Sequence, residues 1–258
     1  MIKWICTLYF SVTLFDLVLS KGHVSLDTHN FDKILSKFHT TLVKFDIAYP
    51  YGAKHEAFLE VAESSKHRPD FLVAEVGVKD YGERDNEDLA KRFNLDSKEF
   101  PVYLLFAQGV KEPYTYKGTT DDDYSAEKVI NFVRSKDTGI WIGAVGCLQD
   151  FDRLAKDFIR SASQERKTLL KSAEDLWDEI KTNSARKSAE FYVKTMRKLV
   201  EISGEGSESE FLTREKARLK GLLNQKVSAQ KKDELKSRMN ILDSFALYVK
   251  SSGGRDEL

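Results

Sequence analysis

The stretch "TLVKFDIAYPYGAKHEAF", residues 41–58, passes from a strand-like pattern of apolar residues to a helical one, and it decides the fold of the N-terminal half. Its first part, up to Ile47, is rich in β-branched and aromatic side chains, which is typical of a strand. From residue 53 to residue 65 the apolar side chains recur at helical spacing. Between the two lies the sequence Tyr49-Pro50-Tyr51. The stretch therefore predicts a strand, a loop stiffened by proline and a helix, in that order.

Strand and helix patterns alternate on both sides of this stretch. "HVSLD", residues 23–27, indicates a short strand, and "FLVAEVGV", residues 71–78, is the near-continuous apolar run of a strand covered on both faces. "PVYLLF", residues 101–106, and "PYTYKG", residues 113–118, flank a turn and indicate a hairpin. Helical patterns occupy residues 30–38, 86–93 and 125–135. The order βαβαβαββα predicts an α/β sandwich with parallel strands first and an antiparallel pair last.

The C-terminal half has a different pattern, because strand signals disappear after residue 147. Apolar residues instead mark successive helix faces, which predicts an all-α bundle of four or five helices over residues 147–250. The segment "TGIWIGAVG", residues 138–146, is apolar and interrupted by glycines, so we expect a short docked linker. The α/β domain is then expected over residues 21–137, with a tail at 251–258.

The two ends of the chain carry targeting signals. Residues 1–20 combine a lysine with an apolar run and predict a secretory signal peptide. An uncleaved anchor is the alternative, but the run is shorter than the about 20 residues of a membrane span, and Asp16 interrupts it. The last four residues resemble the Lys-Asp-Glu-Leu signal that a receptor reads to return lumenal proteins to the endoplasmic reticulum; they are Arg255, Asp256, Glu257 and Leu258. We therefore expect a protein of the endoplasmic reticulum lumen, with no membrane insertion once the signal is cleaved.

Composition excludes several classes of function. Lys plus Arg and Asp plus Glu number 41 each, so no overall positive field favours nucleic acid as a partner. Of the two cysteines, Cys6 leaves with the signal peptide, and Cys147 remains as a single free thiol. The five histidines show no metal-ligand spacing, so neither a metal nor another cofactor is expected.

The N-terminal half resembles the thioredoxin fold in its strand "LVKFDI", the loop and helix "AYPYGAKHEAF" and the strand "FPVYLLF". Residues 49–54 stand at the place of the Trp-Cys-x-x-Cys-Lys of redox-active members, and neither cysteine is present. Lys44 stands where those members keep a proton-relay acid. Thiol–disulfide exchange requires a thiolate, which the N-terminus of the helix normally stabilises. We therefore expect this domain to be redox-inactive.

A closer resemblance is to the redox-inactive family of Windbeutel and endoplasmic reticulum resident protein 29. It extends almost end to end and includes "VSLD", "VKFDIAYPYG", "VAEVGVKDYG", "FPVYLLF", "GCL" and "KKDELKSRMNIL". The resemblance implies an α/β thioredoxin-like N-terminal domain that forms a homodimer, followed by an all-α helical bundle. It places Gly22 and Asp27 near the dimer contact, although Asp27 could instead cap the helix that begins near Asn30.

The resemblance also implies that Tyr49, Pro50 and Tyr51 form an exposed aromatic surface for extended polypeptides. Proline restricts the loop, so little entropy is lost in holding the rings, and tyrosine offers apolar area together with a polar tip. The alternative is that both rings pack against neighbouring loops.

Three further residues are candidates for the same surface. The resemblance implies that Pro101 is the cis-proline facing the loop, with Phe100 at the border of the surface; a trans proline that opens a strand is the alternative. Asp46 shares a strand face with Lys44 and either forms an ion pair there or contacts a ligand.

The resemblance implies a chaperone or escort, not an enzyme, and we expect it to bind secretory client proteins and assist their folding, processing or export. The retrieval receptor is the other expected partner. One alternative is an architectural subunit of a lumenal enzyme. Another is a divergent disulfide isomerase that uses Cys147, although a lone thiol lacks a resolving partner and a free cysteine is most often a small buried residue.

Overall fold

The computed structural model describes residues 22–79, 81–136, 138–202 and 207–252. The predicted signal peptide with Cys6 and the C-terminal tetrapeptide from Arg255 to Leu258 lie outside the described residues. All other residues singled out in the sequence lie within them.

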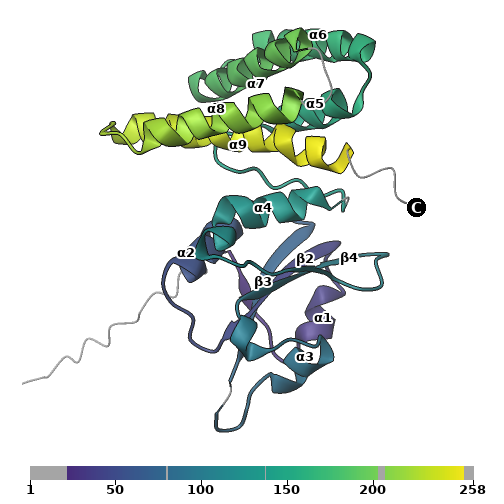
Figure 1. Ribbon diagram of the computed structural model, residues 1–258. Helices are drawn as coiled ribbons and strands as arrows, with labels where there is room; N and C mark the ends of the chain where they lie inside the picture. Colours follow the sequence, from purple (N-terminus) through teal and green to yellow (C-terminus); the bar gives the residue numbers. More distant parts are fainter. Residues whose placement is uncertain (1–21, 80, 137, 203–206, 253–258) are drawn as a thin grey trace, which may run out of the picture.

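The N-terminal domain is built on a mixed sheet whose strands lie in the order β1-β3-β2-β4-β5 (Figure 1). The strands are β1 (Val24–Ser25), β2 (Thr40–Ile47), β3 (Phe71–Val78), β4 (Val102–Ala107) and β5 (Tyr114–Tyr116). β1 and β2 each pair in parallel with β3. β4 pairs in antiparallel fashion with β2, and β5 pairs in antiparallel fashion with β4. This confirms the predicted order of parallel strands followed by an antiparallel hairpin.

Helices cover both faces of the sheet. The helices α2 (Ala53–Ser65) and α4 (Ala126–Ser135) lie on one face, and α1 (Phe31–Leu35) and α3 (Glu87–Arg92) lie on the other (Figure 1). Two short 3₁₀ turns, Ser97–Glu99 and Asp121–Tyr124, complete the domain. Side chains of β2 alternate between the two cores, because Leu42 joins the cluster beneath α2 while Val43 and Phe45 join the opposite one. Double coverage explains why β3 and β4 are almost wholly apolar.

The C-terminal domain contains helices alone in the part of it that the structure describes. Five helices follow one another: α5 (Gln149–Arg160), α6 (Ser163–Glu179), α7 (Asn183–Glu201), α8 (Ser207–Leu223) and α9 (Ala229–Ser252). Each apolar face expected from the sequence lies on one of them, so the predicted fold class is confirmed. Within the described segments, no helix combines the length and apolar character that crossing a bilayer requires.

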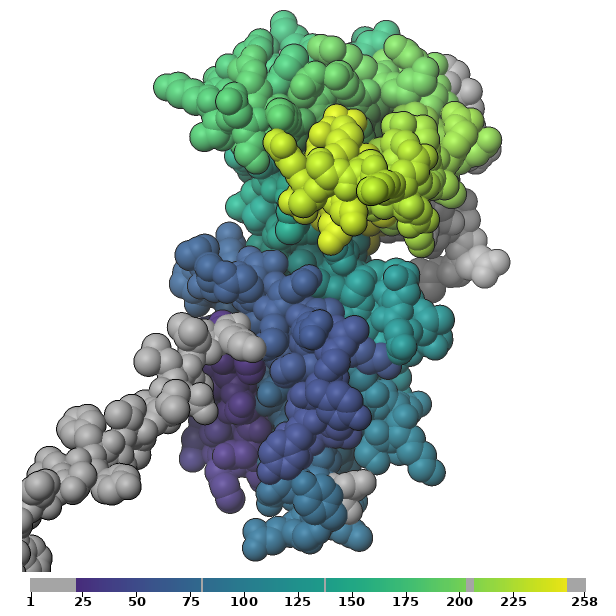
Figure 2. Space-filling view, turned by 90° about the vertical axis from the view of Figure 1, so that its left-hand side faces the viewer, coloured from purple at the N-terminus to yellow at the C-terminus, as the bar shows by residue number. Residues whose placement is uncertain are grey.

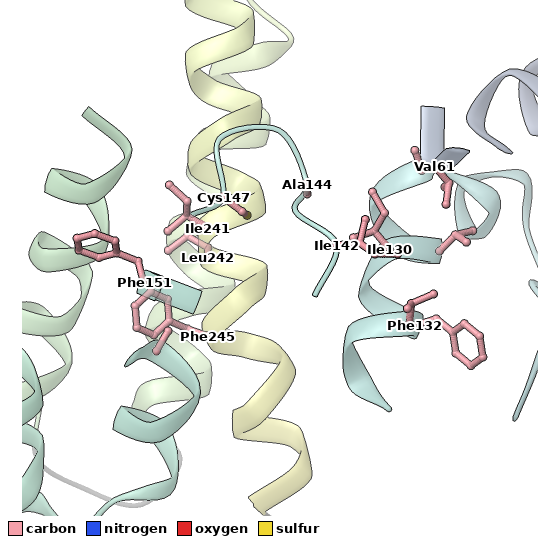
Figure 3. Close-up of a cluster of buried hydrophobic side chains, with 14 of the residues drawn as sticks. Val61, Ile130, Phe132, Ile142, Ala144, Cys147, Phe151, Ile241, Leu242 and Phe245 are labelled. Carbon is pink, nitrogen blue, oxygen red and sulfur yellow. The ribbon is translucent and has the colours of Figure 1, made fainter. Parts of the chain in front are cut away.

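A continuous apolar core joins the two domains. The side chains of Ile140, Ile142 and Ala144, between α4 and α5, are buried in the same cluster as both domain cores. Figure 3 shows this segment running from Ile142, beside Ile130 of α4, toward α9. The connection is therefore packed into the protein and does not act as a free tether.

A buried ion pair reinforces the domain junction. A guanidinium nitrogen of Arg134 in α4 lies 2.8 Å from a carboxylate oxygen of Asp152 in α5, and both side chains are only 2% exposed. Asp152 also accepts hydrogen bonds from Trp141 Nε1 at 2.7 Å and from the Tyr192 hydroxyl at 2.5 Å. Arg134 donates a further bond to Ser244 Oγ at 2.9 Å. The network links α4, the connecting segment, α5, α7 and α9, which fixes the orientation of the domains.

Candidate functional site: an exposed tyrosine surface above a buried lysine

The loop between β2 and α2 presents its two tyrosines to solvent. Tyr49 is 71% exposed and Tyr51 is 85% exposed, so neither ring packs against a neighbouring loop. Gly52 follows at the helix N-cap with φ of 78° and ψ of −167°, a conformation that is essentially restricted to glycine. Pro50 before it and Gly52 after it therefore fix the path of the loop and leave the rings outside.

Two more apolar side chains lie exposed at the same edge of the sheet, Ile47 at 45% and Tyr81 at 58%. Ile47 pairs in register with Val78, so the chain segments that follow β2 and β3 leave the sheet side by side. A hydrogen bond and the charge of Asp85 raise the pKa of Lys79, and Tyr49 and Tyr81 add smaller effects in the same direction. We call Ile47, Tyr49, Tyr51 and Tyr81 the tyrosine surface.

Sequence reasoning found half of this surface and missed Ile47 and Tyr81. Their positions just after strands could have indicated them, since the carboxyl ends of adjacent parallel strands meet at one edge of a sheet. Tyr81 follows β3 by a few residues, as Tyr49 follows β2. Its exposure, however, depends on the loop conformation and is not visible in the apolar pattern.

Phe100 and Pro101 occupy a more interior position than the expected client surface. The peptide bond between them is cis, as the resemblance implied. Pro101 is buried, and Phe100 is partly buried against the cluster of the α1–α3 face. These two residues therefore shape the edge of the sheet but offer little area of their own to a ligand.

A fully buried lysine lies in the sheet below the loop. The side chain of Lys44 is 0% exposed, and its ammonium is 3.1 Å from Asp46 Oδ2 and 3.2 Å from Glu75 Oε2. It also lies 3.2 Å from His55 Nδ1 of α2 and 4.3 Å from the centre of the Phe58 ring. Two carboxylates, an imidazole and an aromatic face thus surround one cation, an arrangement that offsets the large desolvation penalty of a buried charge.

Asp46 has a structural role in this arrangement. One of its carboxylate oxygens pairs with Lys44, and the other accepts the Ile47 backbone N–H at 2.8 Å. Its side chain is 11% exposed. The ion pair, one of the two interpretations left open by the sequence, is present in the structure, and contact of Asp46 with a ligand stays a prediction.

The protonation of His55 follows from its surroundings. Burial lowers the pKa of His55, and the nearby charge of Lys44 lowers it further, outweighing the opposite effects of Glu75 and Asp46. A neutral imidazole can accept a hydrogen bond at Nδ1 from the ammonium of Lys44. The position at which the resemblance places a proton-relay acid in redox-active members therefore holds a lysine that is paired with Asp46 and Glu75.

Cys147 is buried at the start of the helical domain, with its Sγ 3.7 Å from Ser244 Oγ. Burial, together with the charge of Asp152, raises its pKa to about 11. The thiol is therefore protonated at neutral pH and poorly nucleophilic. Across the described ranges, no group of three or more histidine, cysteine, aspartate or glutamate side chains is arranged to hold a metal ion.

The two residues expected near a dimer contact both have local roles. Gly22 has φ of +78°, and a Cβ there would approach the Ala62 carbonyl oxygen to 3.0 Å. Asp27 Oδ1 accepts the backbone N–H groups of His29 at 2.8 Å and Asn30 at 2.9 Å, which shapes the turn into α1. Their contribution to a dimer stays a prediction.

This fold and site define a thioredoxin-like protein of the protein-disulfide-isomerase-related class, with Pro50 and Ala53 at the places of the two redox cysteines. Residues 18–145 match the family model "ERp29, N-terminal domain", and residues 146–245 match "Endoplasmic reticulum protein ERp29, C-terminal domain". The chain therefore belongs to the ERp29 family.

Several known proteins are similar to this chain. Protein windbeutel of Drosophila melanogaster is 35% identical, over 93% of this chain and 92% of that protein. Protein disulfide-isomerase 1 of Dictyostelium discoideum is 27% identical over 86% of this chain, which spans 60% of that protein's length. Among solved structures, the first thioredoxin domain of mouse Protein disulfide-isomerase A4 matches with a TM-score of 0.35 and 18% identity, over 50% of this chain and 85% of that domain.

Proposed function

We propose that this protein is a non-enzymatic chaperone or escort of the endoplasmic reticulum lumen, which holds secretory client polypeptides on the tyrosine surface. The observation that carries the proposal is the exposure of Tyr49 and Tyr51 at 71% and 85% on a constrained loop. An exposed patch of apolar side chains is typical of a protein-binding site, and here Tyr81 and Ile47 are exposed at the same edge of the sheet as the two rings.

The mechanism is reversible binding without bond cleavage. An extended client segment would lay apolar side chains on the rings and place its backbone polar groups against the tyrosine hydroxyls. Because Pro50 and Gly52 fix the loop, little conformational entropy is lost on binding. Covering an apolar client segment in this way prevents its aggregation while it folds or is exported.

Thiol–disulfide exchange is absent from this proposal. The residues at positions 50 and 53 are proline and alanine, and the buried thiol of Cys147 has a raised pKa. Neither position supplies the accessible thiolate that exchange requires.

Targeting and assembly complete the proposal. The signal peptide would direct the chain to the lumen, and the C-terminal tetrapeptide would be read by the retrieval receptor. A homodimer through the thioredoxin-like domain, near Gly22 and Asp27, would present two tyrosine surfaces and raise the avidity for a long client.

The test uses the double variant Tyr49→Ala/Tyr51→Ala in cells that secrete a panel of proteins. Chemical cross-linking and co-precipitation should recover far less client with the variant, because one aromatic anchor contributes about 2 kcal/mol or more to binding. Circular dichroism should be unchanged, since both rings are exposed. Tyr114→Ala is unsuitable as a control because Tyr114 is partly buried against the core, so Val110→Ala, at a 40% exposed site, is the matched control.

Undiminished recovery with the double variant would contradict the proposal. Recovery of one dominant stoichiometric partner, in place of many substoichiometric ones, would favour the architectural subunit instead.

A further inference from the structure

A groove of about 710 Å³ lies where the two domains meet. Its walls come from the C-terminal half of α2, the first turns of α4, the connecting segment and the N-terminal half of α9. Figure 2 shows the face on which α2, in blue, and α9, in yellow, lie on either side of the narrowing between the domains. No residue of the tyrosine surface lines this groove, which we call the junction groove.

The floor of the junction groove is apolar. It is formed by side chains from both domains and from the connecting segment, among them Leu59, Ile130 and Ala144. At its end lies Val145, which is 66% exposed. A second groove of about 560 Å³, between α7 and α9, shares Val145 and Asp233 with the first among its lining residues.

Specific main-chain contacts hold Val145 in its exposed position. Asn240 Nδ2, from the buried side of α9, donates a hydrogen bond to the Val145 carbonyl oxygen at 3.0 Å. The next residue, Gly146, has φ of +86°, and a Cβ there would lie 2.3 Å from the Cβ of Ser237. The backbone at residues 145–146 is therefore pressed against α9, and the valine side chain faces solvent.

The rim of the junction groove is acidic. Glu60, Glu127 and Asp233 line it, and in the part of the chain that the structure describes no ion pair joins them to a basic side chain. A fourth acid, Glu63, is paired with Lys66. Among the described lining residues, Lys236 is the one basic side chain. A ligand with positive charge would therefore be attracted to this rim.

The junction groove is also preformed. The hydrogen bond from Arg134 to Ser244 and the shared apolar core hold α4 and α9 in fixed relation, so the two walls do not have to be brought together by the ligand. A preformed apolar floor reduces the entropy lost on binding.

We propose that the junction groove is a second polypeptide-binding site, specific for extended segments in which apolar side chains alternate with lysine or arginine. The apolar side chains occupy the floor and contact Val145, while the basic side chains pair with Glu60, Glu127 and Asp233. This site goes beyond the tyrosine surface, and its existence does not depend on client binding there.

The test measures fluorescence anisotropy of a labelled ten-residue peptide in which leucine and arginine alternate with serine. Two control peptides replace every arginine by glutamate or every leucine by serine. Wild-type protein should bind the leucine–arginine peptide at least about tenfold more tightly than either control peptide, and more weakly as salt is raised.

Variants locate the site. Glu60→Gln/Glu127→Gln and, separately, Val145→Ser should each weaken binding several-fold, whereas the matched pair Glu83→Gln/Glu112→Gln, at exposed acids away from the groove, should not. Tyr49→Ala/Tyr51→Ala should bind the peptide as the wild type does, which distinguishes this proposal from the proposed function.

Three results would overturn the proposal. The first is equal affinity for the three peptides or no binding by the wild type, and the second is loss of binding in the tyrosine variant alone. The third is a change in the sedimentation of the unliganded protein caused by the groove variants, which would show that a second copy of the chain covers this surface.

Discussion

The ammonium of Lys44 lies 3.2 Å from Nδ1 of His55, in the interior of the thioredoxin-like domain and beneath the loop that carries the exposed tyrosines. Lys44 comes from β2, and His55 comes from the first turns of α2. The pair therefore joins the two elements that flank the tyrosine loop. The charges around it should affect the stability of both elements and so the position of the proposed client surface.

Replacing Lys44 by methionine should destabilise the domain by about 3–5 kcal/mol, because removal of one partner leaves buried carboxylates without a counter-charge. The free energy of unfolding from urea titration gives the measurement. Lys37→Met, at an exposed lysine, should change it by less than about 0.5 kcal/mol.

A second substitution separates charge from packing at this site. Lys44→Met leaves the carboxylates of Asp46 and Glu75 without their cation. Lys44→Met/Glu75→Gln removes one of these two negative charges, so the double variant should recover part of the lost stability. If Lys44→Met alone is as stable as the wild type, the lysine does not hold the cluster together.

The lowered pKa of His55 makes stability dependent on pH. The unfolded chain has an ordinary histidine pKa near 6.5, so below that pH it binds a proton that the folded ring resists. The stability contributed by neutral His55 is therefore complete above about pH 6.5 and is lost progressively as the pH falls toward and through the folded pKa.

Urea titrations between pH 7.5 and pH 5 on the wild type and on His55→Gln check this dependence. The wild type should lose more stability over this range than the variant, and the difference should grow as the pH falls. His67→Gln, at an exposed histidine, is the matched control and should follow the wild type. Parallel curves for the wild type and His55→Gln would contradict the assignment.

The junction between the domains predicts a single cooperative unfolding transition. Arg134→Met leaves Asp152 buried without its cation, and we expect a loss of about 3–5 kcal/mol. Arg134→Met/Asp152→Asn should be more stable than Arg134→Met, since it removes the unpaired charge. Circular dichroism and tryptophan fluorescence should give coincident transitions for the wild type, and clearly separate transitions would show that the domains are not held together by this network.

The local spacing of apolar residues was sufficient to predict much of the fold. The change after Ile47 from a strand-like pattern to helical spacing of the apolar residues located β2 and α2. The five apolar helix faces located the C-terminal helices. The loop between strand and helix was located from local features, whereas the exposure of its tyrosines was expected from the family resemblance. What could not be found were contacts set by strand register and domain packing: Lys44 beside Glu75 depends on the pairing of β2 with β3, and Arg134 with Asp152 depends on docking of α4 against α5. A lysine in an apolar strand and an arginine near a helix end carry no sign of their partners.

The buried thiol of Cys147 gives the sharpest distinction between a binding protein and an isomerase. With a pKa of about 11, only on the order of one thiol in a thousand or fewer is ionised at pH 7.5, and burial hinders access as well. Native wild-type protein should therefore react with iodoacetamide far more slowly than the same protein in urea, as measured by mass spectrometry. In an insulin-reduction assay, wild type and Cys147→Ser should both give the rate of buffer alone. Rapid labelling of the native protein, or insulin reduction that disappears in Cys147→Ser, would instead support the divergent isomerase, because only an accessible thiolate at this position could produce either result.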